Sequence, residues 1–358
     1  MDLATIGNAI ISGLLTGLVY GLSALGLSVI FGVIRIVNFA HGEIMVIGMF
    51  FALILFRTFG IDPLLSVPLA VVVLFLLGGG AFGSRLSNIV FADRRRPWLI
   101  SGGLFALGFA MYWLSGHTLL GSERHSAVLN AFIDAAVTAG VVFFVLAGGL
   151  YGVMLKRVAH LPEHMQFLLL AAIAIVIVSG SLLAFGPDPH GVDVPYALDS
   201  FAIGELIFDK TKVYAAVTAV LVAGLLLAFF KYTATGKAIR ACADNYLGAQ
   251  VVGLNVDRLY AFTFGIGAAC LGAAGCVILL IVEVHPYLAP SYTLLAFVVV
   301  IIGGLGSLPG ALLGGLLIGL SEDLAALWEP SFKSAFSFGL LILVLLLRPQ
   351  GLLGKASH

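Results

Sequence analysis

Long apolar runs separated by short polar connections constrain this chain more than any other sequence feature. A bilayer's hydrocarbon core is about 30 Å thick, so a helix that spans it needs roughly 20 apolar residues. The sequence therefore predicts an all-α polytopic membrane protein, a bundle of about 11 transmembrane helices in a single domain over residues 1–358. The expected spans are 8–34, 40–56, 65–83, 98–115, 128–154, 166–186, 213–230, 259–282, 292–306, 308–326 and 335–347.

The composition agrees with a membrane protein and argues against other classes. Hydrophobic residues make up 61% of the chain and charged residues only 10%, whereas a soluble domain has about 25% charged residues. The net charge is zero, which argues against a nucleic-acid partner. The three cysteines follow no metal-binding or disulfide spacing. They are interpreted as small packing residues, and neither a metal nor a cofactor is expected.

The placement of the basic residues predicts the orientation in the membrane. If the N-terminus is outside, the inner connections hold 13 of the 18 lysines and arginines, and the outer connections hold five. Short cytoplasmic loops are enriched in these residues. The sequence therefore predicts an N-terminus outside and a C-terminus in the cytoplasm, with membrane lipid around the bundle. On this assignment the polar segment 187–209 is outside and the polar segment 231–258 is cytoplasmic.

Glycines recur at every fourth residue in several expected spans. In lipid, small residues at this spacing let helix backbones approach closely. Two interpretations remain open, namely static tight packing and helix interfaces that slide around a transport pathway. The series are Gly13, Gly17 and Gly21; Gly79 and Gly83; Gly148 and Gly152; Gly310 and Gly314; and Gly315 and Gly319.

The polar segment 231–258 is more organised than a topology signal requires. Thr235 is the expected N-cap of a short helix in which Lys237, Arg240 and Asp244 share one face. Apolar residues at the same spacing occupy another face. An amphipathic helix of this kind can dock into a groove on a partner protein. The alternative is a solvated segment that only fixes the topology.

Four stretches carry the most distinctive sequence. Residues 17–50 are GLVYGLSALGLSVIFGVIRIVNFAHGEIMVIGMF, and 236–276 are GKAIRACADNYLGAQVVGLNVDRLYAFTFGIGAACLGAAGC. Residues 301–324 are IIGGLGSLPGALLGGLLIGLSEDL, and 340–354 are LLILVLLLRPQGLLG. Together these stretches resemble the branched-chain amino-acid ABC-transporter permeases, specifically the H-type subunit. The resemblance covers roughly three quarters of the chain, and NFAHGE and GKAIRACADN are its most specific motifs.

The resemblance implies that 231–258 is a cytoplasmic coupling loop, which seats in a cleft on an ATP-binding subunit. Closure of two ATP-binding subunits then switches two permease subunits between outward- and inward-facing states. The chain has no GxxxxGK[ST] motif, so the ATPase site is expected on another polypeptide and this subunit is not expected to be an enzyme. The implied coupling residues are Lys237, Arg240, Ala243, Asp244 and Gly253.

One region departs from the family pattern. Residues 65–125 form an extra segment relative to the family, interpreted as two inserted helices joined by the basic connection 85–97. Because two helices cross the membrane and return, the insertion preserves the topology of everything that follows. The sequence assigns the insertion no role.

The NFAHGE motif places Asn38, His41 and Glu43 at the start of an expected membrane helix. Polar groups in membrane segments are costly and often functional. If this helix starts inside the membrane, its positive N-terminal end can face an amino-acid carboxylate, as in transporters with broken helices. The three residues are therefore predicted to lie on the translocation pathway. The alternative is capping, with Asn38 as the N-cap and Glu43 favouring the positive helix end.

A second group of polar residues is expected at the outer ends of the spans. Together with segment 187–209, this group is predicted to dock an external solute-binding protein, and Glu322 and Asp323 are candidates to join it. Solvated loop ends are the alternative for all of these residues. The predicted docking residues are Glu283, His285 and Tyr287.

The resemblance implies a permease subunit of an ABC importer for branched-chain amino acids, in the inner membrane of a bacterium. The expected partners are an identical or homologous second permease subunit, two ATP-binding subunits and a periplasmic or extracellular solute-binding protein. Urea, short amides and other amino acids are alternative cargoes, because related permeases carry them. Two other classes remain open: an ion- or proton-coupled secondary transporter with His41 and Glu43 as the relay, and a passive channel.

Overall fold

The computed structural model describes residues 3–79, 149–156, 162–204 and 206–354. Within these ranges, eight helical segments are long and apolar enough to cross a membrane. A shorter apolar helix, α3 (Pro63–Gly78), joins them. The eight are α1 (Leu3–Ile34), α2 (His41–Phe59), α8 (Glu163–Phe185), α9 (Lys210–Tyr232), α12 (Val256–Ile278), α13 (Ala289–Gly303) with the preceding 3-10 turn Pro286–Leu288, α14 (Leu308–Ala326), and α15 (Lys333–Leu347) with the preceding 3-10 turn Pro330–Phe332.

This architecture confirms the prediction of a mostly helical, multi-spanning membrane protein. Each of these nine helices overlaps one expected span. The expected span 98–115, most of 128–154 and the inserted region from residue 80 onward lie outside the described residues. A π-helical turn, Tyr151–Leu155, is described after that gap. Two short helices, α10 (Ala234–Asp244) and α11 (Tyr246–Val251), separate α9 from α12.

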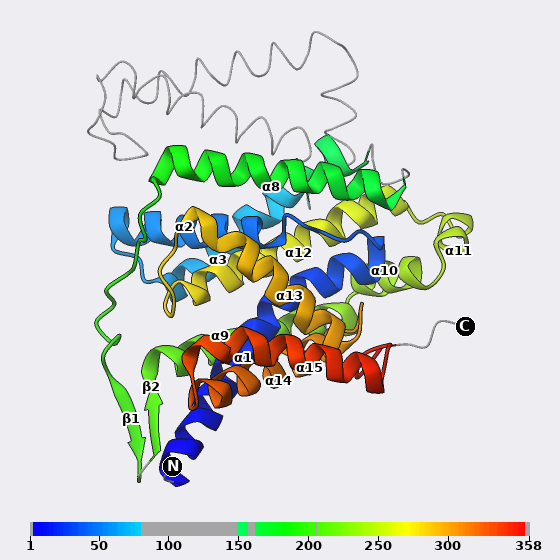
Figure 1. The fold of residues 1–358 in the computed structure, drawn as a ribbon. Coiled ribbons are helices and arrows are strands. Elements are labelled where there is room, and N and C mark those ends of the chain that lie inside the picture. The colour runs from blue at the N-terminus through cyan, green and yellow to red at the C-terminus, as the bar shows by residue number, and fades with distance from the viewer. Residues whose placement is uncertain (1–2, 80–148, 157–161, 205, 355–358) are drawn as a thin grey trace, which may run out of the picture.

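The two ends of the bundle differ in structure. At one end, β1 (Ser200–Ile203) and β2 (Leu206–Asp209) form an antiparallel hairpin beside the N-terminal end of α1 (Figure 1). The backbone N–H of Ile207 in β2 donates to Asn8 Oδ1 of α1 at 2.9 Å. The helices α10 and α11 lie at the opposite end (Figure 1). These are called the hairpin end and the α10–α11 end below.

The glycine series predicted from the sequence brings α1 and α14 into backbone contact. A Cβ atom on Gly17 would lie 2.7 Å from the carbonyl oxygen of Gly315, and one on Gly13 would lie 2.8 Å from that of Gly319. Both distances are too short for a real Cβ atom. Only glycine therefore allows α1 and α14 to approach this closely.

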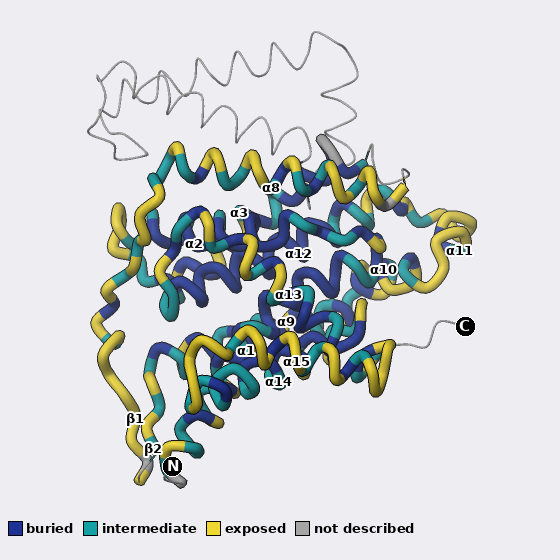
Figure 2. The backbone as a smooth tube through the Cα atoms, viewed as in Figure 1, coloured by how far each residue is buried: buried dark blue, intermediate teal, exposed yellow. Residues whose placement is uncertain are grey.

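The most buried helix is α12, which packs against α1, α2 and α3 (Figure 2). The outer helices present large apolar side chains instead, among them Leu183 of α8, Leu225 of α9 and Leu346 of α15, all more than 70% exposed. Such faces suit contact with lipid or with another apolar protein surface. The bundle therefore has a glycine-rich interior and an apolar exterior.

Candidate functional site

The predicted pathway residues Asn38, His41 and Glu43 lie together in the interior of the bundle. After α1 ends, a short non-helical segment turns back, and α2 begins among the other helices (Figure 1). Asn38 and His41 have no exposed surface, and Glu43 is 4% exposed. His41 Nε2 lies 3.1 Å from the carbonyl oxygen of Ser23, in the second half of α1.

Two independent contacts place the start of α2 near the middle of the bundle. An α-helix rises 1.5 Å per residue, so Ser23 lies about 16 Å along α1 before its end at Ile34. Thr293, which contacts the first turn of α2, lies about 15 Å along α13 before its end at Gly303. The start of α2 is therefore enclosed by α1 and α13, away from the ends of those helices at Ile34 and Gly303.

Two side chains of the protein accept hydrogen bonds from backbone N–H groups at the start of α2. The backbone N–H of Ala40 donates to Asn38 Oδ1 at 3.1 Å, and that of Gly42 donates to Thr293 Oγ1 at 2.8 Å. The Thr293 hydroxyl in turn donates to Glu43 Oε2 at 3.4 Å. The N-cap residue is Ala40, so the prediction that Asn38 itself is the N-cap is wrong. Asn38 Oδ1 accepts from the N–H of the N-cap residue Ala40 rather than from an N–H of the first turn, so Asn38 does not cap the helix.

Thr293 is the member of this site that the sequence did not indicate. It is 8% exposed and lies 251 residues after Gly42. A Cβ atom on Gly42 would overlap the carbonyl oxygen of Ala289 and the Thr293 hydroxyl, so α2 and α13 meet at a glycine. In the sequence, Thr293 is a single threonine within an apolar run. That pattern does not indicate that it contacts the start of α2.

The helix α10 has the amphipathic character predicted for the 231–258 segment. Lys237, Arg240 and Asp244 are exposed, whereas Ile239 and Cys242 are buried. Burial raises the pKa of the Cys242 thiol, so this cysteine is a neutral packing group at pH 7. The charged face of α10 therefore points away from the protein.

The capping residue of α10 differs from the prediction. Thr233, not Thr235, is the N-cap, and its hydroxyl oxygen accepts from the Gly236 N–H at 3.0 Å. Thr233 is also the C-cap of α9, so a single residue separates the two helices. Among the other predicted coupling residues, Ala243 is half-buried, and Gly253 is exposed with a φ of 83°, after α11 has ended.

An exposed apolar ridge on and just after α11 continues this surface. Leu247 is 69% exposed, Val251 87% and Val252 75%. On the opposite side, Ala249 is buried with Cys242 and Val256. The sequence argument located the apolar face of α10 but not this second apolar surface. The α10–α11 end thus presents a charged helix face and an apolar ridge on consecutive helices.

At the hairpin end, the structure brings the two predicted docking segments together. His190 and Val284 form a β-bridge with backbone hydrogen bonds of 2.8 and 2.9 Å. The Arg57 guanidinium lies 3.3 Å from His190 Nδ1, which ties the end of α2 to the same loop. Glu283 and Tyr287 beside this bridge are exposed, and His285 is half-buried.

Glu322 and Asp323 do not join that surface as the sequence suggested. Both are only half-exposed and bond to neighbouring helices rather than lying in a solvated loop end. Ser337 of α15 donates to Glu322 Oε1 at 2.7 Å. Asp323 accepts from Ser12 of α1 and lies 3.7 Å from Lys333 Nζ. These contacts hold α1, α14 and α15 together.

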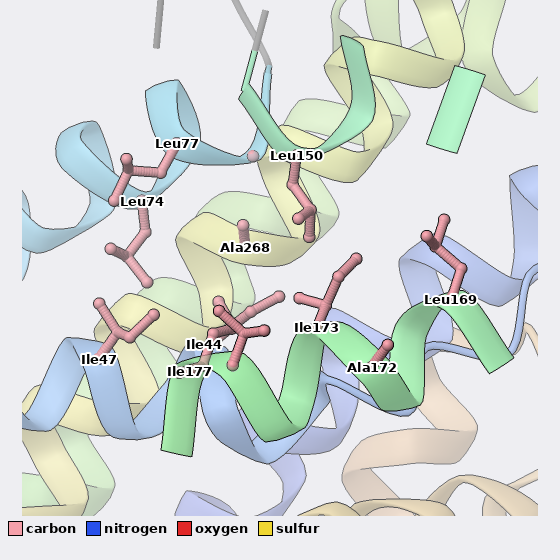
Figure 3. A pocket seen from close by; sticks show the side chains of 12 residues that line it. Ile44, Ile47, Leu74, Leu77, Leu150, Leu169, Ala172, Ile173, Ile177 and Ala268 are labelled. Carbon is pink, nitrogen blue, oxygen red and sulfur yellow. The ribbon is translucent and has the colours of Figure 1, made fainter. Parts of the chain in front are cut away.

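An apolar cavity of about 480 Å³ lies between α2, α3, α8 and α12 (Figure 3). Its lining consists of aliphatic side chains and one glycine, including Ile44, Leu74, Ile173 and Ala268. A charged group without a partner is strongly unfavourable in such surroundings. The cavity therefore offers no site for the charged groups of an amino acid.

Comparison with known proteins gives one consistent result. The family model described as "Branched-chain amino acid transport system / permease component" matches residues 9–345. The high-affinity branched-chain amino acid transport system permease protein LivH of Salmonella typhimurium is 28% identical, over 96% of this chain and 94% of that protein. The corresponding BraD protein of Pseudomonas aeruginosa is also 28% identical, over 97% and 95%.

A more distant relative comes from an archaeon. The probable branched-chain amino acid transport permease protein LivH of Methanocaldococcus jannaschii is 25% identical, over 93% of this chain and 88% of that protein. No solved structure matches the chain. Because the family model covers nearly the whole sequence, the chain belongs to the family of permease components of branched-chain amino acid transport systems.

Proposed function

We propose that this chain is the membrane-spanning permease subunit of an ATP-driven importer of branched-chain amino acids in a bacterial inner membrane. Family membership and the names of the relatives support the transport class and the cargo. The observation that carries the proposal is the surface at the α10–α11 end. It combines exposed charges with an exposed apolar ridge, and a chain without an ATP-binding motif needs such a surface to receive an ATPase.

This surface couples the ATP-binding subunit to the helix bundle. Lys237, Arg240 and Asp244 supply charges for orientation, and Leu247 and Val251 supply apolar area that a partner cleft can bury. Buried faces of α10 and α11 pack on α12, the central helix of the bundle. Movement of the ATPase cleft therefore transmits to the bundle through α12. This is how ATP binding elsewhere shifts the permease between its two states.

The pathway and the outer docking surface complete the proposal. Asn38, His41 and Glu43 lie on the translocation pathway, because they are buried polar groups at the start of α2 inside the bundle. A solute-binding protein docks on the hairpin end through Glu283, His285 and Tyr287. The excess of basic residues expected in the inner connections supports an orientation with the N-terminus and the hairpin end outside and the α10–α11 end in the cytoplasm. The partner permease is a second copy or a homologue.

The energy source tests this function. The proteoliposomes hold this chain, its permease partner, the ATP-binding subunits and the binding protein. We expect leucine uptake that requires ATP inside the vesicles and that continues after a protonophore has removed the proton gradient. A secondary transporter would lose uptake when the ion gradient is removed, and a channel would conduct with neither energy source. Uptake that ignores ATP but follows the gradient would overturn the proposal and make His41 and Glu43 the first relay candidates.

Tyr287→Ala combined with Glu283→Lys is expected to weaken docking of the binding protein. Both side chains are exposed beside the His190–Val284 bridge, so their replacement leaves the bundle intact but removes an aromatic anchor and reverses a charge. We expect at least about a tenfold rise in the binding-protein concentration needed for half-maximal uptake, equivalent to about 1.4 kcal/mol. Trp328→Ala, at an exposed aromatic outside this surface, is the control.

A further inference from the structure

The interior start of α2 is electrostatically suited to a carboxylate. The first N–H groups of a helix have no partner within the helix, and the helix dipole makes this end positive. Anions therefore bind readily at such ends. In the described state, the Thr293 hydroxyl oxygen holds the Gly42 N–H, and the Glu43 carboxylate lies beside it. The chain's own oxygen atoms occupy the places where a ligand's carboxylate oxygens would bind.

Two buried polar groups at this helix end have no hydrogen-bond partner within the described part of the chain. They are Asn38 Nδ2 and His41 Nδ1, on side chains with no exposed surface. Asn38 is anchored at the helix end because its Oδ1 accepts from the Ala40 N–H. An unpartnered buried polar group is unfavourable, and in a native structure it requires an explanation.

The chemistry of these two groups is complementary. Asn38 Nδ2 carries two N–H donors. The Ser23 carbonyl oxygen can only accept, so His41 Nε2 carries the hydrogen, and Nδ1 of the neutral ring is left with a lone pair. An unmet donor group and an unmet acceptor match the two ends of an amino-acid zwitterion, whose carboxylate accepts and whose ammonium donates. Glu43 adds a negative charge for the ammonium group.

We propose that the start of α2 is the subsite for the carboxylate and ammonium groups of the transported amino acid, and that Thr293 closes it by occupying the place of a carboxylate oxygen. This inference rests on the proposed function and specifies its binding chemistry. Asn38 and the Gly42 N–H receive the carboxylate, and His41 Nδ1 and Glu43 receive the ammonium. Thr293 is a positioning residue that must leave before the substrate enters.

The replacement of Thr293 by valine tests the closure. Valine has nearly the same shape but no hydroxyl, so its methyl group cannot accept from the Gly42 N–H. Moving the side chain aside for the substrate then no longer costs that hydrogen bond. The readout is the thermal unfolding midpoint of the purified complete transporter, without binding protein, titrated with L-leucine. We expect half-maximal stabilisation of Thr293→Val at a leucine concentration at least about tenfold lower than for the native protein. Leucinamide, which lacks the carboxylate, should not stabilise either protein.

Two further variants make the test specific. Thr263→Val is the matched control, because Thr263 is fully buried in α12 and its hydroxyl donates only to its own helix, at Leu259. Its leucine response should equal that of the native protein. Asn38→Asp keeps the oxygen that accepts from the Ala40 N–H and replaces the N–H donors by a negative charge, so it should abolish the leucine response of Thr293→Val.

Each result decides the inference. A Thr293→Val midpoint that is lowered equally at every leucine concentration would show a purely structural role and overturn the subsite. Equal responses to leucine and leucinamide would also overturn it.

If Thr293→Val does not fold, Asn38→Asp alone should reduce leucine uptake at least tenfold while ATP hydrolysis stays responsive to the loaded binding protein. Native uptake by that variant would overturn the subsite. Failure of ATP-driven uptake by the native complex would instead overturn the proposed function.

Discussion

Charge reversal at Lys237 and Arg240 is expected to abolish ATP-driven uptake while the protein still inserts and folds. Both side chains are exposed on α10, and exposed substitutions usually change the free energy of unfolding by less than about 0.5 kcal/mol. Loss of charge pairs across a protein interface costs about 2–5 kcal/mol when those pairs are buried in the complex. We therefore expect uptake to fall at least tenfold, and the ATP-binding subunit to be lost during affinity purification.

The apolar ridge provides an independent arm of the same test. Val251→Asp places a charge on a residue that is 87% exposed in the isolated subunit but central to the proposed contact. It should also release the ATP-binding subunit. Arg348→Glu, an exposed charge reversal at the same end of the bundle but outside the surface, is the control. Retained ATPase and native uptake in both test variants would eliminate these side chains as essential contacts.

Gly315→Ala is expected to destabilise the bundle by forcing α1 and α14 apart. A Cβ atom at this position would lie 2.6 Å from the carbonyl oxygen of Gly17, a backbone atom that cannot rotate away. The helices α1 and α14 must separate, and overpacking of this kind costs about 1–3 kcal/mol. The measurement is the thermal unfolding midpoint in detergent, followed by size-exclusion chromatography.

Gly224→Ala is the matched control for this change. Gly224 lies in α9, and a methyl group added there would have no other atom within 4 Å to clash with. Alanine is also favoured over glycine in a helix by about 1 kcal/mol. The midpoint of this control should therefore stay the same or rise.

The pair of variants also separates the two interpretations of the glycine series. A Gly315→Ala protein with a native midpoint but no uptake would favour sliding helices, whereas a lowered midpoint supports static packing.

Much of the fold was predictable because its causes are local. Nine expected spans overlap described helices, since the length of an apolar run reports directly on the bilayer thickness. The glycine series in α1 and α14 was visible because its four-residue spacing follows from helix geometry. The exposed face of α10 was visible for the same reason. Even here the cap was misplaced, because Thr233 and Thr235 have equal capping chemistry and only the end of α9 selects between them.

The interior site depended on contacts that sequence spacing does not encode. The NFAHGE motif indicated polar residues at a helix start, but the position of that start inside the bundle follows from His41 meeting Ser23 and Gly42 meeting Thr293. The bridge between His190 and Val284 and the ties of Glu322 and Asp323 to α15 likewise join distant segments. The sequence by itself determined which segments enter the membrane and which faces are polar, because period and length are properties of one helix. Only the tertiary structure decided which polar groups meet, because hydrogen-bond partners are chosen by the packing of whole helices against one another.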